Sequence, residues 1–163
     1  MNTIQQLFLL SFGRFNPVEL PYSIRWLTFL MMLNFLNHLS FFGRQTSLGA
    51  ASVMSLLSLL AEFFVLHLIL WLRNQRNRFL KLAIALLGTH MILSLLFQLL
   101  LSFHWGSFSF GLMFFCSVWA LAVNSNIFWQ GLGVSKVKAV FIALSFECLA
   151  TLLIMPYLGG LLS

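Results

Sequence analysis

The chain has 163 residues, of which 61% are hydrophobic and only 7% are charged, and its mean hydropathy is +0.98. A soluble domain usually carries about 25% charged residues, so a soluble monomer of this composition would have almost no polar surface to face water. These values exclude an ordinary cytoplasmic enzyme, a disordered tail and a disulfide-stapled secreted domain. They indicate a protein whose solvent is the lipid bilayer.

The first twenty residues are predicted to form an interfacial helix. Over residues 2–15 the apolar side chains recur at helical spacing, and polar residues occupy the positions between them. A short helix with an apolar stripe is typical of a segment that lies along the membrane surface. Pro17 and Pro21 then end it, because proline cannot continue a helix interior. The stripe consists of Ile4, Leu7, Phe8, Phe12 and Phe15.

Five long apolar runs follow this segment. A membrane-spanning helix needs roughly 20 apolar residues, and the short loops between the runs leave no room for a soluble domain. The sequence therefore predicts an all-α, polytopic membrane bundle that forms a single domain over residues 1–163. The predicted spans are residues 24–42, 50–72, 79–101, 108–130 and 139–161.

The basic residues predict an orientation. The chain has nine Lys and Arg against three acidic residues, and with five spans all but one of the nine share a side with the N-terminus. By the positive-inside rule the N-terminus is cytoplasmic and the C-terminus lies outside, in a membrane of the bacterial inner-membrane type. Because these residues are dispersed between apolar runs, no nucleic-acid binding is predicted. Arg44 lies on the far side, and the shared side receives Arg14, Arg25, Arg73, Arg76, Arg78, Lys81, Lys136 and Lys138.

Four polar side chains within the spans are predicted to form a layer near mid-membrane. From the helical rise, each lies roughly 12–17 Å from the cytoplasmic end of its span. Ionisable residues inside a membrane are costly and therefore suggest function. The four come from four different helices, which favours their convergence in the bundle interior. They are Asn34, Glu62, His90 and Glu147.

Three interpretations of this layer stay open. The side chains could hydrogen-bond the helices to one another, which is an ordinary structural role. A carboxyl beside an imidazole could also exchange protons near neutral pH, as proton-coupled transport requires. Two Glu and one His could in principle hold a divalent metal, but no metal or cofactor is predicted. The stretch Asn124–Asn126 could line a cavity, but polar interhelical contacts toward the end of a span are ordinary, and this interpretation is favoured.

Enzyme activity is not expected. The sequence contains no GxSxG, HExxH, P-loop or GxGxxG pattern. Loops this short could hardly build a water-exposed active site.

The order of features resembles the Yip-domain membrane family, which is named for its interaction with Rab-type GTPases. Asn16 and Pro17 precede the first span, a basic turn follows the second, and residues 133–139, GVSKVKA, lead into the last. For bacterial members the resemblance implies an integral membrane protein. The acidic, tyrosine-containing motifs of the eukaryotic members are absent, so GTPase binding is not inferred.

The leading functional prediction is a non-enzymatic membrane protein that acts through in-membrane contacts. Its expected partners are membrane lipids and either a protein partner or further copies of itself. The alternative is a small transporter or proton-conducting subunit that uses Glu62, His90 and Glu147. The two interpretations differ in whether the polar layer faces one connected, water-accessible cavity.

Overall fold

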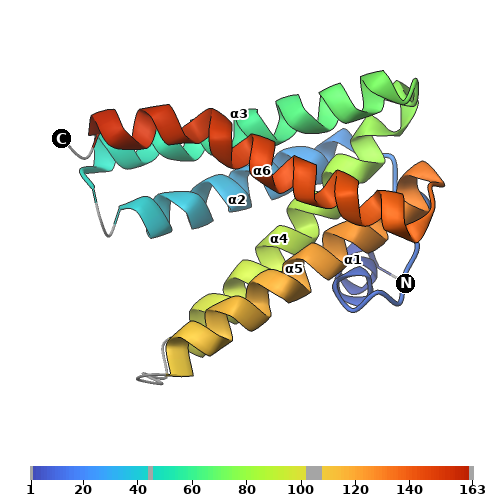
Figure 1. Ribbon diagram of the computed structural model, residues 1–163, viewed down its shortest axis with the longest axis horizontal. Coiled ribbons are helices and arrows are strands. Elements are labelled where there is room, and N and C mark those ends of the chain that lie inside the picture. Colours follow the sequence, from blue (N-terminus) through green and yellow to red (C-terminus); the bar gives the residue numbers. More distant parts are fainter. Residues whose placement is uncertain (1, 44–45, 102–107, 162–163) are drawn as a thin grey trace.

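The fold is all-α within the residues that the structure describes (Figure 1). The computed structural model describes the backbone of residues 2–43, 46–101 and 108–161, and the side chains of these except 101, 108–110 and 157–161. Two short 3₁₀ turns, η1 (Pro17–Glu19) and η2 (Arg76–Arg78), interrupt the helices. The helices are α1 (Thr3–Ser11), α2 (Ile24–Phe42), α3 (Leu48–Leu72), α4 (Phe79–Leu101), α5 (Phe108–Leu132) and α6 (Lys136–Leu161).

Each of the five predicted spans is a single helix, and its bounds agree with the prediction to within three residues. In the described part of the chain, four of these helices, α3 to α6, are long and apolar enough to cross a membrane. The polar residues Asn34, Asn37 and His38 lower the hydropathy of α2, which is not among the four. The chain is therefore a multi-pass integral membrane protein.

The five long helices form two groups that lie against each other (Figure 1). Helices α2, α3 and α6 run side by side, with α3 in contact with both of the others. Helices α4 and α5 form a second pair that crosses them obliquely, and α4 contacts α2 while α5 contacts α6. The two groups therefore share an interface. Helix α4 contacts α1, α2, α3 and α5.

Small side chains allow the helices to approach closely. On α6, Ala139 and Ala143 are fully buried, and on α4 the same holds for Ala85. Small residues are enriched at helix contacts in membranes because lipid provides no hydrophobic drive for helices to associate, so close van der Waals packing must stabilise them. Larger side chains fill the remaining space, as where the Phe128 and Phe146 rings pack with centroids 5.7 Å apart. Outward positions carry large apolar residues, and α3 presents such a stripe in Val53, Leu56, Leu60 and Phe64.

Several hydroxyl groups within the helices are satisfied locally. Ser55 donates to the Ala51 carbonyl at 2.7 Å, and Thr89 donates to the Ala85 carbonyl at 2.8 Å. Both residues are fully buried. Such bonds to the preceding turn leave no unpaired hydroxyl in an apolar environment.

The N-terminal helix is shorter than predicted. Asn2 and Gln5 form a capping box at its start, while Gly13, with φ +70°, turns the chain after its end at Ser11. Leu7 and Leu10 are buried. Its predicted separation from α2 is confirmed, because η1 lies between the two helices.

Most of the predicted apolar stripe of this helix faces away from the rest of the protein. Ile4, Phe8 and Phe12 are exposed by 60, 51 and 44%, because the buried face is set by contact with α4 and α5 rather than by the apolar pattern alone. Leu7 packs against Gly88, and the Trp119 indole donates to the Ser11 carbonyl at 3.1 Å. The helix is thus docked onto the α4–α5 pair.

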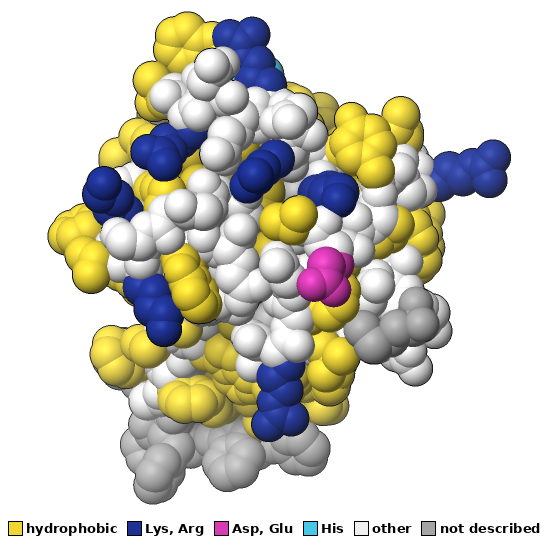
Figure 2. All heavy atoms as spheres, turned by 90° about the vertical axis from the view of Figure 1, so that its right-hand side faces the viewer, with side chains coloured by type: hydrophobic (Ala, Val, Ile, Leu, Met, Phe, Trp, Pro, Cys, Tyr) yellow, Lys and Arg dark blue, Asp and Glu magenta, His cyan; other side chains and the backbone are white. Residues whose placement is uncertain are grey.

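Basic side chains gather at one end of the bundle, as Figure 2 shows for the face on the right of Figure 1. The loop predicted as the cytoplasmic basic loop, Arg73, Arg76, Arg78 and Lys81, lies between α3 and the first turn of α4. Arg44, predicted on the opposite side, lies outside the described residues.

Members of this loop also hold the fold together. Arg78 donates to the Gly131 carbonyl and Gln75 donates to the Leu132 carbonyl at 3.3 Å, so both cap the C-terminal end of α5. A cation at a helix C-terminus also complements the helix dipole. Lys81 donates to the Val18 carbonyl and ties η1 to α4, while Arg76 lies 5.9 Å from the centre of the Trp71 ring.

The contact between α1 and α4 makes a testable prediction. A Cβ atom at Gly88 would lie 2.5 Å from Leu7 Cδ2, so Gly88→Val should overpack the contact and destabilise the fold by about 1–3 kcal/mol. Thermal unfolding in detergent measures this as a lower Tm. Leu7→Ala in the Gly88→Val background vacates the space and should recover part of the loss, whereas additive losses in the double variant would contradict the contact.

Candidate functional site

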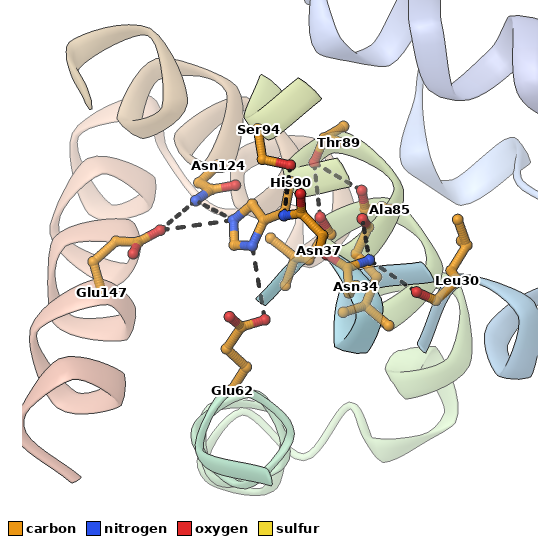
Figure 3. A network of polar contacts seen from close by, with 12 residues as sticks. Leu30, Asn34, Asn37, Glu62, Ala85, Thr89, His90, Ser94, Asn124 and Glu147 are labelled. Atoms are coloured by element: carbon orange, nitrogen blue, oxygen red, sulfur yellow. Dashed lines mark hydrogen bonds and ion pairs between the residues drawn. The ribbon is translucent and has the colours of Figure 1, made fainter. Parts of the chain in front are cut away.

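The candidate site is centred on the His90 imidazole, which lies between two carboxylates from different helices (Figure 3). His90 Nδ1 is 3.7 Å from Glu62 Oε2 of α3, and Nε2 is 3.8 Å from Glu147 Oε1 of α6. Both distances are within ion-pair range. The side chains of Glu62 and His90 are only 17 and 20% exposed, whereas that of Glu147 is 46% exposed.

Helix geometry explains why these residues meet. Helices α3 and α4 are joined by a short connection at the basic end, and Glu62 and His90 lie at similar distances from it. Glu147 lies at a similar distance from the start of α6. With a rise of 1.5 Å per residue, all three lie roughly 15–17 Å from that end along their helices.

Asn124 of α5 completes the cluster and links two of its members. Its Nδ2 donates to Glu147 Oε1 at 2.6 Å and lies 3.1 Å from His90 Nε2. In this orientation Nε2 accepts, so the ring proton of a neutral imidazole is on Nδ1, which faces Glu62. The Asn124 side chain is buried, and its Oδ1 has no hydrogen-bond partner among the described residues.

Sequence reasoning missed Asn124 as a site residue, because polar contacts near the end of a span are common. The signal that could have found it is its depth. Asn124 lies about 12 Å from the end of α5, which places it close to the layer that contains Glu62, His90 and Glu147.

The cluster faces a cavity of about 500 Å³ between the two groups of helices. Ligand sites in proteins commonly have volumes of about 300–1,000 Å³. Apolar side chains of α4 and α5, including Leu93, Phe97 and Met113, complete the wall. The polar lining residues are Asn34, Asn37, His38, Glu62, His90, Ser94, Ser117 and Glu147.

The fourth predicted member of the layer, Asn34, lines the same cavity but is engaged elsewhere. Its Nδ2 donates to the Leu30 carbonyl at 2.9 Å and to the Leu87 carbonyl of α4 at 3.0 Å. Asn34 is 2% exposed. It therefore connects α2 to α4, and among the described residues it forms no hydrogen bond with the carboxylates.

A short ladder of polar contacts continues from Asn34 along α2 and α4 (Figure 3). Asn37 Nδ2 donates to Ser94 Oγ at 2.9 Å, and Gln98 Nε2 donates to Asn37 Oδ1 at 2.8 Å. These bonds pair groups that lipid could not satisfy. They account for the polar composition of α2, whose apolar side chains alone would not select α4 as a partner.

The two remaining histidines of the spans differ in position. His38 lines the cavity, and its Nδ1 is buried with no hydrogen-bond partner among the described residues. His67 lies apart from the cavity lining and packs edge-on against the Phe79 ring, with the two ring centroids 5.9 Å apart.

The arrangement suits proton exchange better than metal binding. In the described part of the chain, no group of three or more His, Cys, Asp and Glu side chains is placed to hold a metal ion. Two carboxylates flank the two ring nitrogens of one imidazole, which can pass a proton from one nitrogen to the other by changing tautomer. Glu62, His90 and Glu147 all line the open cavity.

No family model, curated protein or solved structure matches the chain. The resemblance to the Yip-domain family receives no support from these comparisons, and the function proposed below does not rest on it.

Removal of the Asn124 amide should destabilise the cluster. Asn124→Leu leaves His90 Nε2 and Glu147 Oε1 without their shared donor, and an unsatisfied buried polar group costs about 1–3 kcal/mol. Thermal unfolding in detergent should therefore give a clearly lower Tm. Ser117→Ala is the control, because the exposed Ser117 hydroxyl bonds to the Met113 carbonyl of its own helix. Equal Tm values for the two variants would contradict a bonded Asn124.

Proposed function

We propose that this membrane protein conducts protons, with Glu62, His90 and Glu147 as the groups that bind and release them. The observation that carries the proposal is the position of His90, with a carboxylate of another helix within 4 Å of each ring nitrogen and the cluster open to a cavity of about 500 Å³. A purely structural set of contacts needs no such cavity.

The contacts support a defined route for the proton. With the ring proton on Nδ1, His90 Nε2 can accept a second proton from Glu147, and the imidazolium can then release its Nδ1 proton to the Glu62 carboxylate. The Asn124 amide can present either Nδ2 or, after rotation about its Cβ–Cγ bond, its unpartnered Oδ1 to the same neighbours. In the first orientation Nδ2 donates to an unprotonated neighbour, and in the second Oδ1 accepts from a protonated one. Asn124 can therefore hydrogen-bond to the cluster before and after proton transfer.

The half-exposed Glu147 side chain supports proton exchange with the cavity. Glu147 lines the cavity with 46% of its side chain accessible, whereas Glu62 is more enclosed. A group that conducts protons needs one partner in contact with water and another shielded from it. His90, which lies between the two carboxylates, can connect these environments.

The alternative function, which rests on in-membrane contacts with partners, has less support. Exposed apolar side chains occur on all five long helices, and lipid alone would cover all of them. No single surface among the described residues is favoured as a partner interface. The structural features that distinguish this chain from a generic apolar bundle are the cluster and its cavity.

We extend the proposal to the topology, with five spans, a cytoplasmic N-terminus and an external C-terminus. Helix α2 has 19 residues and is about 28 Å long, close to the roughly 30 Å of a bilayer core. Its polar groups are paired with α4 rather than presented to lipid. The basic face in Figure 2 supports the assignment of that end to the cytoplasm.

Glu62→Gln tests the proton-conducting role. The amide keeps a polar group beside His90 but cannot release a proton, so the fold should persist while conduction stops. Purified protein in liposomes that enclose a pH-sensitive dye, with a K⁺ diffusion potential, reports proton flux directly. We expect wild-type flux well above that of empty liposomes and a loss of at least tenfold in the variant.

Glu19→Gln is the matched control, because Glu19 is the third acid of the chain and is exposed outside the long helices. It should conduct as the wild type does. If wild-type liposomes leak protons no faster than empty ones, or if Glu62→Gln conducts normally, the proton-conducting role is wrong.

The topology makes a separate prediction. A reporter that is active only in the cytoplasm should be active when inserted near Asn77 and silent when fused after Ser163. Activity at the second site, or silence at the first with normal expression, would contradict the five-span arrangement.

A further inference from the structure

A second pocket lies between α5 and α6, separate from the proton site. Its volume is about 440 Å³, and α5 and the first turns of α6 line it. Along α5 its lining runs from Trp129 and Asn126 near the basic end to Leu121 and Val118 deeper in the membrane-spanning part. The distance from Trp129 to Val118 along the helix is about 16 Å. The pocket is therefore polar and basic at one end and apolar at the other.

One end of the pocket carries excess positive charge. Lys136 is exposed and lies with its Nζ 4.6 Å from the centre of the Trp129 ring. It is the first residue of α6, and Lys138 follows in the same turn, which holds no acidic residue. A helix N-terminus already carries a partial positive charge, so two lysines there are unfavourable unless an anion is bound.

Asn126 lies where the pocket borders the N-terminal segment. Its Oδ1 accepts from Gln130 at 2.9 Å, but its Nδ2 is buried without a hydrogen-bond partner among the described residues. Asn126 lines the pocket, but this nitrogen is enclosed by the protein. The chain at Gly13 passes close by, because a Cβ atom there would lie 3.5 Å from Asn126 Nδ2. The next residue, Arg14, adds a cation to this part of the surface.

We propose that this pocket binds one anionic phospholipid of the surrounding bilayer. The headgroup phosphate lies at Lys136 and the α6 N-terminus, and an acyl chain follows Leu121 and Val118 into the membrane. The pattern of a basic mouth, an interfacial tryptophan and an apolar channel matches the order of headgroup, interface and acyl chain in a lipid. A free anion would use only the mouth and leave the apolar length unexplained.

The test compares lipids and variants by thermal unfolding of the full chain in an uncharged detergent. Phosphatidylglycerol should raise the Tm saturably, whereas phosphatidylcholine and inorganic phosphate should not. Lys136→Gln should need about fivefold more phosphatidylglycerol for half of the effect. One lysine near an anionic surface contributes about 1 kcal/mol, which corresponds to about fivefold in affinity. Lys138→Gln, which removes the same charge outside the pocket, should respond as the wild type does.

A second variant pair separates the pocket from the charge. Val118→Trp should block the acyl-chain end and weaken the phosphatidylglycerol effect, while Phe114→Trp, one turn further along α5 and outside the lining, should not. Equal weakening by Lys136→Gln and Lys138→Gln would indicate diffuse surface charge and overturn the proposal. So would an equal effect of phosphatidylcholine or of inorganic phosphate, or a normal response of Val118→Trp.

Discussion

In the hydrocarbon core of a bilayer no water is present to satisfy a polar group, so each polar side chain must find a partner in the protein. The hydroxyl groups of Ser55 and Thr89 meet this demand within their own helices. The carboxyl, imidazole and amide groups require a second helix. Their pairing determines which helices meet, because apolar side chains interact as well with lipid as with one another.

Helix α4 is where these demands converge. Its backbone accepts from Asn34 at Leu87, its Ser94 and Gln98 pair with Asn37, and its His90 lies between Glu62 and Glu147. Packing with small residues then holds α3, α5 and α6 around it. Because α2, α3 and α6 form one group and α4 and α5 another, the polar contacts between the groups also line the cavity (Figure 1). The same groups that hold the helices together are thus available for proton exchange.

The helices themselves could be predicted from sequence because long apolar runs and the breaks at Pro17 and Gly133 act locally. The depth of Glu62, His90 and Glu147 was also accessible, since depth depends only on helical rise. Rotation about each helix axis is not accessible from sequence, so sequence reasoning groups Asn34 with the carboxylates and interprets Asn124 as an ordinary interhelical contact. The buried face of α1 likewise depends on a distant surface, where Gly88 leaves space for Leu7.

The central claim is that His90 contacts both carboxylates at once, and solid-state NMR in lipid bilayers tests it most directly. Dipolar recoupling between ¹⁵N-labelled histidine and ¹³C-labelled glutamate should give two contacts, from Nδ1 to the Glu62 carboxyl and from Nε2 to the Glu147 carboxyl. When glutamine is left unlabelled, the first contact should vanish in the Glu62→Gln variant and the second in the Glu147→Gln variant. A spectrum in which His90 shows no carboxyl contact, or contacts only one of the two, would contradict the account.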